Sequence, residues 1–243
     1  MPTAAGIIIG NEILTGKFAD ENGPFLIRRF RELGVDLLRI VTIADDPAAI
    51  AREVAYCSAT FDHVFTSGGV GPTHDDLTLS SIALAFDVPA EADPRLVDIL
   101  AAAGLTDEHS LRMATVPRGT ELLWEAEATF PVFRMRNVFV FPGVPALFRA
   151  KFELVAHRFA GEKVHSTRLF TDERETAIAA RLDRAQQAHP QVDIGSYPRF
   201  GEGPWRVIVT LESRDRDALV RAEAELREVL HLVQPPEDAS KEP

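Results

Sequence analysis

The chain has 243 residues, with 26 Lys and Arg against 37 Asp and Glu, and therefore a formal net charge of −11 at pH 7. This length suits one large domain or a medium domain with a smaller companion, and the 46% of apolar residues excludes wholesale disorder. A single cysteine, Cys57, excludes an intrachain disulfide framework and any cysteine-based zinc site.

The sequence also predicts where the protein is located in the cell and which classes of partner it does not bind. No stretch approaches the ~18 consecutive apolar residues of a membrane helix, so we expect no membrane partner. The N-terminus lacks the basic and apolar regions of a signal peptide, which predicts a cytoplasmic protein. The acidic balance disfavours nucleic acid as a partner, although backbone N–H groups can still build a local anion site.

Strand-like and helix-like segments alternate over a first domain, residues 1–160. The expected strands are Ala5–Ile9, Val35–Ala44, His63–Ser67, Phe130–Met135 and Asn137–Phe141, and the expected helices are Asn22–Leu33, Pro47–Ala59, Thr78–Phe86, Pro94–Ala103 and Ala146–Phe159. Such alternation predicts an α/β domain with a parallel sheet covered on both faces. The turns that follow its strands then gather at the carboxyl edge of the sheet, where ligands usually bind.

The pattern changes near Gly161, and residues 161–233 are expected to form a smaller α+β domain. Its expected elements are the strand Val164–Thr171, the helix Glu173–Ala188, the strands Val192–Tyr197 and Trp205–Glu212, and the helix Arg216–Leu230. Asp172 and Glu175 have the spacing of a capping box at the first helix. Residues 234–243 are polar and contain proline, which predicts a disordered tail.

The strongest local signal is the segment 66–78, in which a buried strand leads into glycines, a polar loop and a helix. Gly68, Gly69 and Gly71 let the backbone turn and leave N–H groups free to face an anion. Carboxylates that follow such a loop repel phosphate unless a metal ion or a cationic side chain lies between, so the pattern suggests a phosphate-bearing ligand with a divalent cation. A tight turn whose aspartates cap the helix explains the same residues.

Three other turns follow strands and are expected at the same edge. In the segment 10–17, Lys17 could bind a phosphate and Glu12 could orient a polar ring or a metal, although a plain loop is the alternative. Asp46 fits a helix cap, which leaves Asp45 as a free candidate carboxylate. The Pro-Gly-Val-Pro turn at 142–145 gives a rigid path with close access for a ligand, and its simplest role is rigidity.

Other reactive residue types favour structural roles. Cys57 lies within a predicted helix and is expected to be a small core residue. The chain contains neither a nucleophile-elbow nor a Walker A pattern. Among the histidines, only His74 lies inside the glycine loop, where it could contact a ligand or transfer a proton.

Residues 68–78, Gly-Gly-Val-Gly-Pro-Thr-His-Asp-Asp-Leu-Thr, resemble the signature of competence/damage-inducible protein A (CinA). They also resemble the molybdopterin-binding-like half of animal FAD synthases, and both belong with the Mog-type molybdopterin-binding domains of molybdenum-cofactor biosynthesis. The similarity extends through residues 9–16 and 141–145 and into the small domain at 195–198. The loop motif is specific, whereas the Pro-Gly-Val-Pro turn alone is weak.

The resemblance implies a doubly wound, mostly parallel α/β domain whose carboxyl edge holds a phosphate-bearing pterin or dinucleotide. By position, Asp76 matches one family carboxylate and Asp45 the second. CinA relatives are associated with metal-dependent cleavage of ADP-ribose, and the FAD synthase half with hydrolysis of FAD to FMN and AMP. Relatives are commonly dimers or trimers, which implies a homo-oligomer.

The sequence departs from these relatives in three ways. Asn11 stands where the family commonly has Asp, which weakens a metal role there. The segment 127–132 lacks a glycine-containing stretch of CinA and is closer to the FAD synthase form, which favours a dinucleotide over a pterin. The chain carries neither the amidase domain of the former nor the adenylyl-transfer domain of the latter, so neither of those activities is expected.

Three functions therefore compete: a nucleotide pyrophosphatase, a binding module for molybdopterin or a nucleotide, and an interaction protein with a vestigial pocket. The first is favoured, with a divalent Mg, Mn or Co ion and no tightly bound organic cofactor beyond the ligand. The predicted catalytic residues are Asp76, Asp45, Lys17 and His74, and the predicted metal ligands are Asp76, Asp75 and Asp45. The predicted substrate-binding residues are Gly10, Glu12, Gly68, Gly69, Val70, Gly71, Pro72, Thr73, Thr78, Pro142, Gly143 and Pro145.

Overall fold

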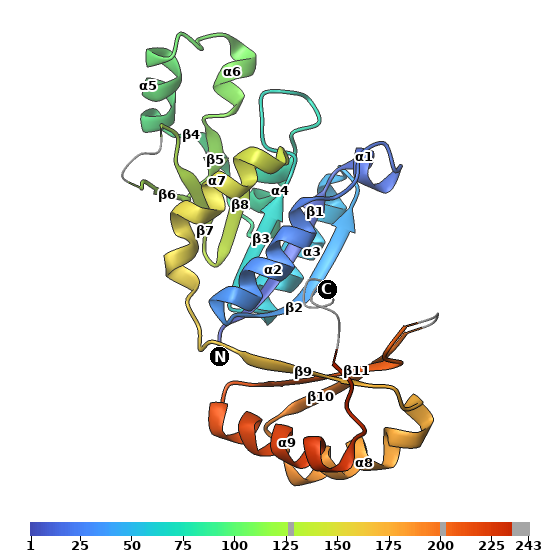
Figure 1. Cartoon of the computed structure of the whole chain (residues 1–243). Coiled ribbons are helices and arrows are strands. Elements are labelled where there is room, and N and C mark those ends of the chain that lie inside the picture. Colours follow the sequence, from blue (N-terminus) through green and yellow to red (C-terminus); the bar gives the residue numbers. More distant parts are fainter. Residues whose placement is uncertain (126–128, 200–202, 235–243) are drawn as a thin grey trace. The chain divides into compact units, whose positions relative to one another are not determined.

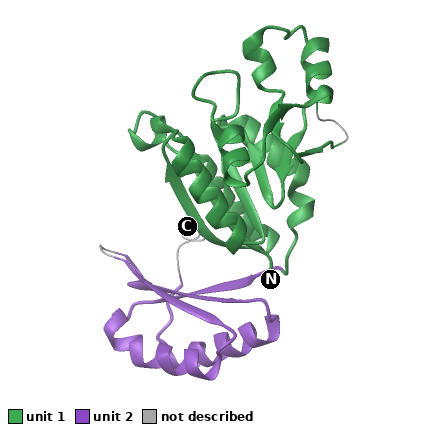
Figure 2. Ribbon diagram, turned by 180° about the vertical axis from the view of Figure 1, so that it is seen from behind, with its two compact units in different colours: residues 1–162 green, residues 163–243 purple. Residues whose placement is uncertain are grey.

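The computed structural model describes residues 1–125, 129–199 and 203–234, in two compact units over residues 1–162 and 163–243 (Figure 2). The predicted disordered tail therefore lies outside the described residues, apart from Gln234. Within the described part of the chain, every helix is too short or too polar to cross a membrane.

Unit 1 contains most of the elements, and Figure 1 labels them in chain order. They are β1 (Thr3–Ile9), α1 (Asn11–Leu14), α2 (Asn22–Leu33), β2 (Asp36–Ile43), α3 (Pro47–Thr60), β3 (His63–Ser67), α4 (Thr78–Ala85), β4 (Ala90–Ala92), α5 (Pro94–Ala102), α6 (Glu108–Arg112), β5 (Thr115–Pro117), β6 (Glu121–Leu123), β7 (Val132–Met135), β8 (Val138–Phe141), α7 (Pro145–Val155) and the 3₁₀ helix η1 (Ala156–Phe159).

The central sheet of unit 1 has six strands in the order β2-β1-β3-β8-β7-β6. The first four are parallel, whereas β7 and β6 run antiparallel to their neighbours. The prediction of a doubly wound, mostly parallel sheet is confirmed. The antiparallel edge arises because β7 and β8 are joined by a hairpin too short for a crossover helix.

Alternating side chains of the central strands feed two cores, one on each face of the sheet. Ile7, Val64 and Val140 pack with α3 and α4 into a largely aliphatic core. Phe65 and Phe141 face the other way and form an aromatic core with α2 and α7. In Figure 1, α2 and α7 accordingly lie on one face of the sheet and α3 on the other.

Local signals explain where the helices begin and end. Asp46 accepts a hydrogen bond from the Ala49 N–H at the start of α3, and Pro47 takes the first helical position. Gly34 ends α2 in the left-handed conformation, as a C-terminal glycine does. Cys57 is buried in the aliphatic core, as expected, and burial followed by the Glu53 carboxylate raises the pKa of its thiol to about 12.

Unit 2 is an antiparallel sheet in the order β10-β11-β9 with two helices that share its core. Its elements are β9 (His165–Thr171), α8 (Glu175–Ala188), β10 (Asp193–Pro198), β11 (Val207–Ser213) and α9 (Arg216–Val229). The smaller α+β fold is thereby confirmed. The predicted capping box is wrong: α8 begins without a side-chain cap, because Asp172 bonds the His231 ring and Glu175 accepts from the Ser196 hydroxyl.

Candidate functional site

The register of the parallel strands places four turns at one edge of the central sheet. Ile9 lies beside Ile43, Ile8 beside Ser67, and Ser67 beside Phe141. The turns that follow β1, β2, β3 and β8 therefore start at the same level, as the sequence predicted. In Figure 1 the long loop after β3 and the α1 segment both lie at this edge.

The glycine loop packs directly against the neighbouring turns. Gly68 and Gly69 have φ angles of 103° and 61°, which L side chains rarely adopt. A Cβ atom at Gly68 would lie 2.1 Å from the Ile9 carbonyl oxygen, and one at Gly143 would lie 3.2 Å from the Gly68 Cα. Glycine at 68 thus lets three backbone segments meet at the edge of the sheet.

The far end of the loop is held by Thr78 at the start of α4. Its side chain is fully buried, and its hydroxyl donates to the Gly68 carbonyl over 2.7 Å. Its N–H donates to the Gly69 carbonyl over 3.0 Å. Thr78, predicted to bind substrate, thus has its hydroxyl engaged in closing the glycine turn onto the helix.

Thr73 and Asp76 form a second closed turn within the same loop. Asp76 Oδ2 accepts from the Thr73 N–H over 2.7 Å and from the Thr73 hydroxyl over 2.6 Å. The Thr73 hydroxyl also holds the pKa of Asp75 below its usual value. His74 is 94% exposed, and its Nδ1 lies 4.0 Å from Asp75 Oδ1. The loop thus fixes Asp76 and presents His74 to solvent.

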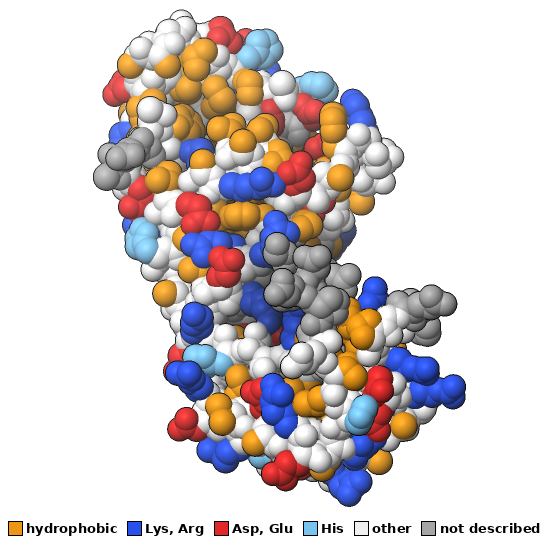
Figure 3. Space-filling model, in the orientation of Figure 1, with side chains coloured by type: hydrophobic (Ala, Val, Ile, Leu, Met, Phe, Trp, Pro, Cys, Tyr) orange, Lys and Arg blue, Asp and Glu red, His pale blue; other side chains and the backbone are white. Residues whose placement is uncertain are grey.

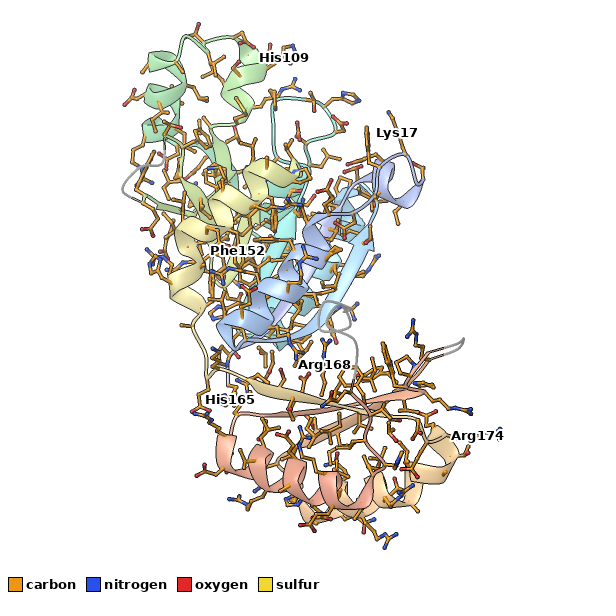
Figure 4. The ribbon with its side chains drawn as sticks, in the orientation of Figure 1. Lys17, His109, Phe152, His165, Arg168 and Arg174 are labelled. Carbon is orange, nitrogen blue, oxygen red and sulfur yellow. The ribbon has the colours of Figure 1, made fainter. Side chains whose placement is uncertain are left out.

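The other predicted catalytic residues lie on separate turns of the edge. Asp45 Oδ2 accepts from the Asn11 N–H over 2.7 Å, which ties the turn after β2 to α1. The Lys17 amine lies 5.7 Å from the Phe18 ring centroid, and Figure 4 shows Lys17 extending away from the sheet. Neither Asp45 nor Lys17 lines the cavity beside the glycine loop.

That cavity has a volume of about 250 Å³ and two kinds of wall. One wall comes from the glycine loop and the start of α4. The other comes from an excursion of the chain, residues 88–118, that carries β4, α5, α6 and β5. The lining residues are Gly69, Val70, Gly71, Thr73, His74, Asp76, Leu77, Leu79, Ser80, Ala90, Arg112, Met113 and Thr115. The contribution of the excursion to the site was not predicted from the sequence, because elements as short as β4, α6 and β5 contain too few residues to show a periodic pattern.

Three consecutive residues of the cavity wall have backbone N–H groups without an acceptor. Among the described residues, the N–H groups of Gly69, Val70 and Gly71 form no hydrogen bond within the protein. Successive free N–H groups in a turn are an anion-binding arrangement. The eight-residue helix α4 follows the loop and adds the positive end of its dipole.

Asn22, at the first position of α2, joins three edge segments and was missed as a site residue. Its Nδ2 donates to the Ser67 hydroxyl and to the Gly143 carbonyl, both over 2.8 Å. Asn22 is 4% exposed, and its Oδ1 is buried without a hydrogen-bond partner. A polar residue at a helix start resembles an ordinary cap, so the sequence gives no separate signal for this role.

The three predicted metal ligands, Asp75, Asp76 and Asp45, lie on two different turns. Within residues 1–125, 129–199 and 203–234, no three His, Cys, Asp or Glu side chains are arranged to hold a metal. Asp75 and Asp76 share the glycine loop, whereas Asp45 lies on another turn bonded to Asn11. Mg²⁺ is often held by one or two carboxylates with substrate phosphates and water, so Asp76 fits a cation that arrives with a phosphate.

Comparison with known protein families identifies the family of this chain. Residues 5–187 match the family model described as "Probable molybdopterin binding domain". The chain belongs to this family. Residues 163–235 also match the model "FAD synthase, middle domain", which corresponds to unit 2. The resemblance inferred from residues 68–78 is therefore confirmed.

Individual relatives agree with the family. A protein from Archaeoglobus fulgidus is 32% identical over 225 residues, which cover 93% of this chain and 96% of that one. A "Probable FAD synthase" from Caenorhabditis elegans is 35% identical over 263 residues; the match takes in 95% of this chain but only 51% of that protein. A "CinA-like protein" from Myxococcus xanthus is 39% identical over 153 residues, 59% of this chain and 36% of its own length.

A solved structure shares the fold of unit 1. The protein CinA from Thermoplasma acidophilum, described as of unknown function, gives a TM-score of 0.59 at 26% sequence identity. The match covers 65% of this chain and 98% of that one.

Proposed function

We propose that the carboxyl edge of unit 1 binds a nucleotide or pterin through its phosphate. The main support for this proposal is that Gly69, Val70 and Gly71, on the wall of the cavity, have free N–H groups. A phosphate oxygen would accept from these groups at the positive end of α4, where helix N-termini favour anions. The relatives' names, molybdopterin binding domain and FAD synthase, support a phosphate-bearing ring compound as the ligand.

The size of the cavity indicates that it holds only part of the ligand. About 250 Å³ is less than the roughly 300–1,000 Å³ of whole small-molecule sites, so the cavity suits the phosphate and its near neighbours. The rest of the ligand would extend along the edge past Glu12, Lys17 and Gly143. A dinucleotide of the FAD type is favoured, because 95% of this chain matches a FAD synthase.

Hydrolysis of the diphosphate is the second candidate, and the Asp76 carboxylate on the cavity wall favours it. Water would add to one phosphorus while the P–O bond to the other phosphate breaks, which gives FMN and AMP from FAD. A divalent cation bound by Asp76 would neutralise the diphosphate and lower the pKa of a bound water. Lys17 lies on a separate turn outside the cavity, so it would contact the second phosphoryl group of the ligand, and His74 would accept a proton.

The substitution Asp76→Asn should change ligand binding and hydrolysis in opposite directions. Asp76→Asn keeps an acceptor for the Thr73 N–H but removes a negative charge from the cavity wall. We expect it to strengthen metal-free binding of ADP-ribose several-fold, because charge repulsion falls. The same variant should abolish AMP release from FAD or ADP-ribose in Mg²⁺, Mn²⁺ or Co²⁺.

Calorimetric titration in EDTA and an AMP-release assay measure the two effects. Asp98→Asn, on the exposed face of α5, is the control for a lost surface charge. Equal affinity for adenosine and ADP-ribose would contradict phosphate binding. AMP release that persists in Asp76→Asn would contradict the catalytic role of this carboxylate while leaving the binding proposal in place.

A further inference from the structure

We propose that Arg112 is the cation that binds the ligand's phosphoryl group in the cavity, with or without a divalent metal. This inference rests on the proposed function and assigns a binding residue to it. An anion beside Asp76 requires a nearby positive charge, since the carboxylate repels phosphate. Among the described residues that line the cavity, Arg112 is the one Lys or Arg side chain.

The excursion brings Arg112 to the cavity. Arg112 is the last residue of α6, and Met113 and Thr115, which follow it, line the same wall. Figure 4 labels His109 one helical turn earlier and shows α6 beside the glycine loop. Figure 3 shows hydrophobic side chains among charged ones over this end of unit 1, and the cavity wall itself combines apolar residues such as Leu77 and Met113 with the polar Thr73 and Asp76.

The partners of Arg112 leave its guanidinium available. Its nearest carboxylate is Glu108, with 3.9 Å between Nη2 and Oε1, which is beyond hydrogen-bond distance. Glu108 is 88% exposed and Arg112 46% exposed, so solvent screens the pair and it adds little stability. Within the described ranges, the Arg112 guanidinium forms no hydrogen bond to another residue.

The two other arginines of the excursion differ sharply from Arg112. Arg118 donates to Glu91 Oε2 through Nε and Nη2, over 3.0 and 2.9 Å. Arg95 donates through Nε to Asp93 Oδ1 over 3.0 Å and through Nη2 to Asp93 Oδ2 over 2.6 Å. Both cations are therefore neutralised in place, whereas Arg112 keeps its donors for a ligand.

Guanidinium chemistry fits the proposed ligand. Its planar fork of N–H donors matches two oxygens of a phosphate, and it remains charged at all working pH values. The phosphate would thus meet Arg112 from the excursion and the free N–H groups of the glycine loop. Together these groups offset the charge of Asp76.

The test is calorimetric binding of ADP-ribose to the whole chain in EDTA, comparing wild type with Arg112→Gln, Arg112→Lys and the control Arg118→Gln. We expect Arg112→Gln to bind at least about tenfold more weakly, in line with loss of a charged hydrogen bond. Arg112→Lys should fall between Arg112→Gln and wild type, and Arg118→Gln should match wild type. Raising the salt concentration should weaken wild type more than Arg112→Gln.

The outcomes separate the two proposals. Wild-type affinity in Arg112→Gln would overturn the role of Arg112 but leave phosphate binding standing. Binding by wild type only when Mg²⁺ is added would also overturn it, since the guanidinium would then be insufficient. If wild type binds ADP-ribose no better than adenosine under any condition, the proposed function itself fails.

Discussion

Replacing Asn22 tests whether one buried amide holds the edge of the sheet together. Asn22→Ala removes the two 2.8 Å hydrogen bonds to Ser67 and Gly143 and leaves the Gly143 carbonyl without this donor. At about 1 kcal/mol for each neutral hydrogen bond, the free energy of unfolding of unit 1 should fall by about 2 kcal/mol.

Asn22→Asp separates the hydrogen bonds from simple packing. The carboxylate has nearly the shape of the amide, but it cannot donate and it sets a negative charge against the Gly143 carbonyl. An unpaired buried charge costs about 3–5 kcal/mol, so Asp should destabilise unit 1 more than Ala does. In the alanine variant, part of the loss in stability is offset because the unpartnered Oδ1 is removed with the side chain.

Urea denaturation followed by tryptophan fluorescence measures this loss. Trp124 lies in unit 1 and Trp205 in unit 2, so a Trp205→Phe background reports on unit 1 alone. With an m value of about 2 kcal/mol/M, the midpoint should fall by about 1 M for Asn22→Ala. An Asn22→Asp variant as stable as Asn22→Ala would show that Nδ2 does not face the two acceptors.

Three further predictions concern unit 1. Gly68→Ala should cost on the order of 3 kcal/mol, because its Cβ meets the Ile9 carbonyl at 2.1 Å, whereas Gly104→Ala, with a φ of 76° and open space, should cost only about 1 kcal/mol in the same urea assay. Cys57 should resist iodoacetamide in the native protein and react fully in urea, since burial raises its pKa to about 12; alkylation counted by mass spectrometry checks this. Burial holds the pKa of His63 below 6.5, so the unfolded chain binds more protons than the folded protein near that pH. The contribution of neutral His63 to the free energy of unfolding should therefore be fully present above pH 6.5 and be lost as the pH falls below this value. His63→Gln should reduce the change in the urea midpoint between about pH 5 and 8.

Much of the fold of unit 1 could be predicted because its signals are local. The helix over residues 22–33 was predicted with the same bounds, since a 3.6-residue apolar period and a terminal glycine mark it. The buried strand ending at Ile9 is an apolar run followed by glycine, and the strand ending at Ser67 has the β-branched and aromatic residues Val64, Phe65 and Thr66 before its glycines. The short helix α1 and the small strands β4, β5 and β6 were not predicted, because three or four residues contain less than one period of either pattern.

The capping error at α8 has a different cause. Asp172 and Glu175 have the right spacing, but each finds a partner far along the chain, His231 and Ser196. These long-range bonds compete with the local cap, and a sequence pattern cannot weigh contacts that depend on the folded sheet. Propensity is thus overridden by tertiary structure at this position.

The family, the α/β architecture and the edge at which the glycine loop lies could all be predicted from the sequence, because each depends on a motif or a pattern of neighbouring residues. Which side chains share the cavity became clear only from the tertiary structure. It brought Arg112 from the excursion to the glycine loop, set Asp45 against Asn11, and buried Asn22 between Ser67 and Gly143. The physical reason is that these contacts join residues far apart in the chain, and their geometry is fixed by packing on the sheet.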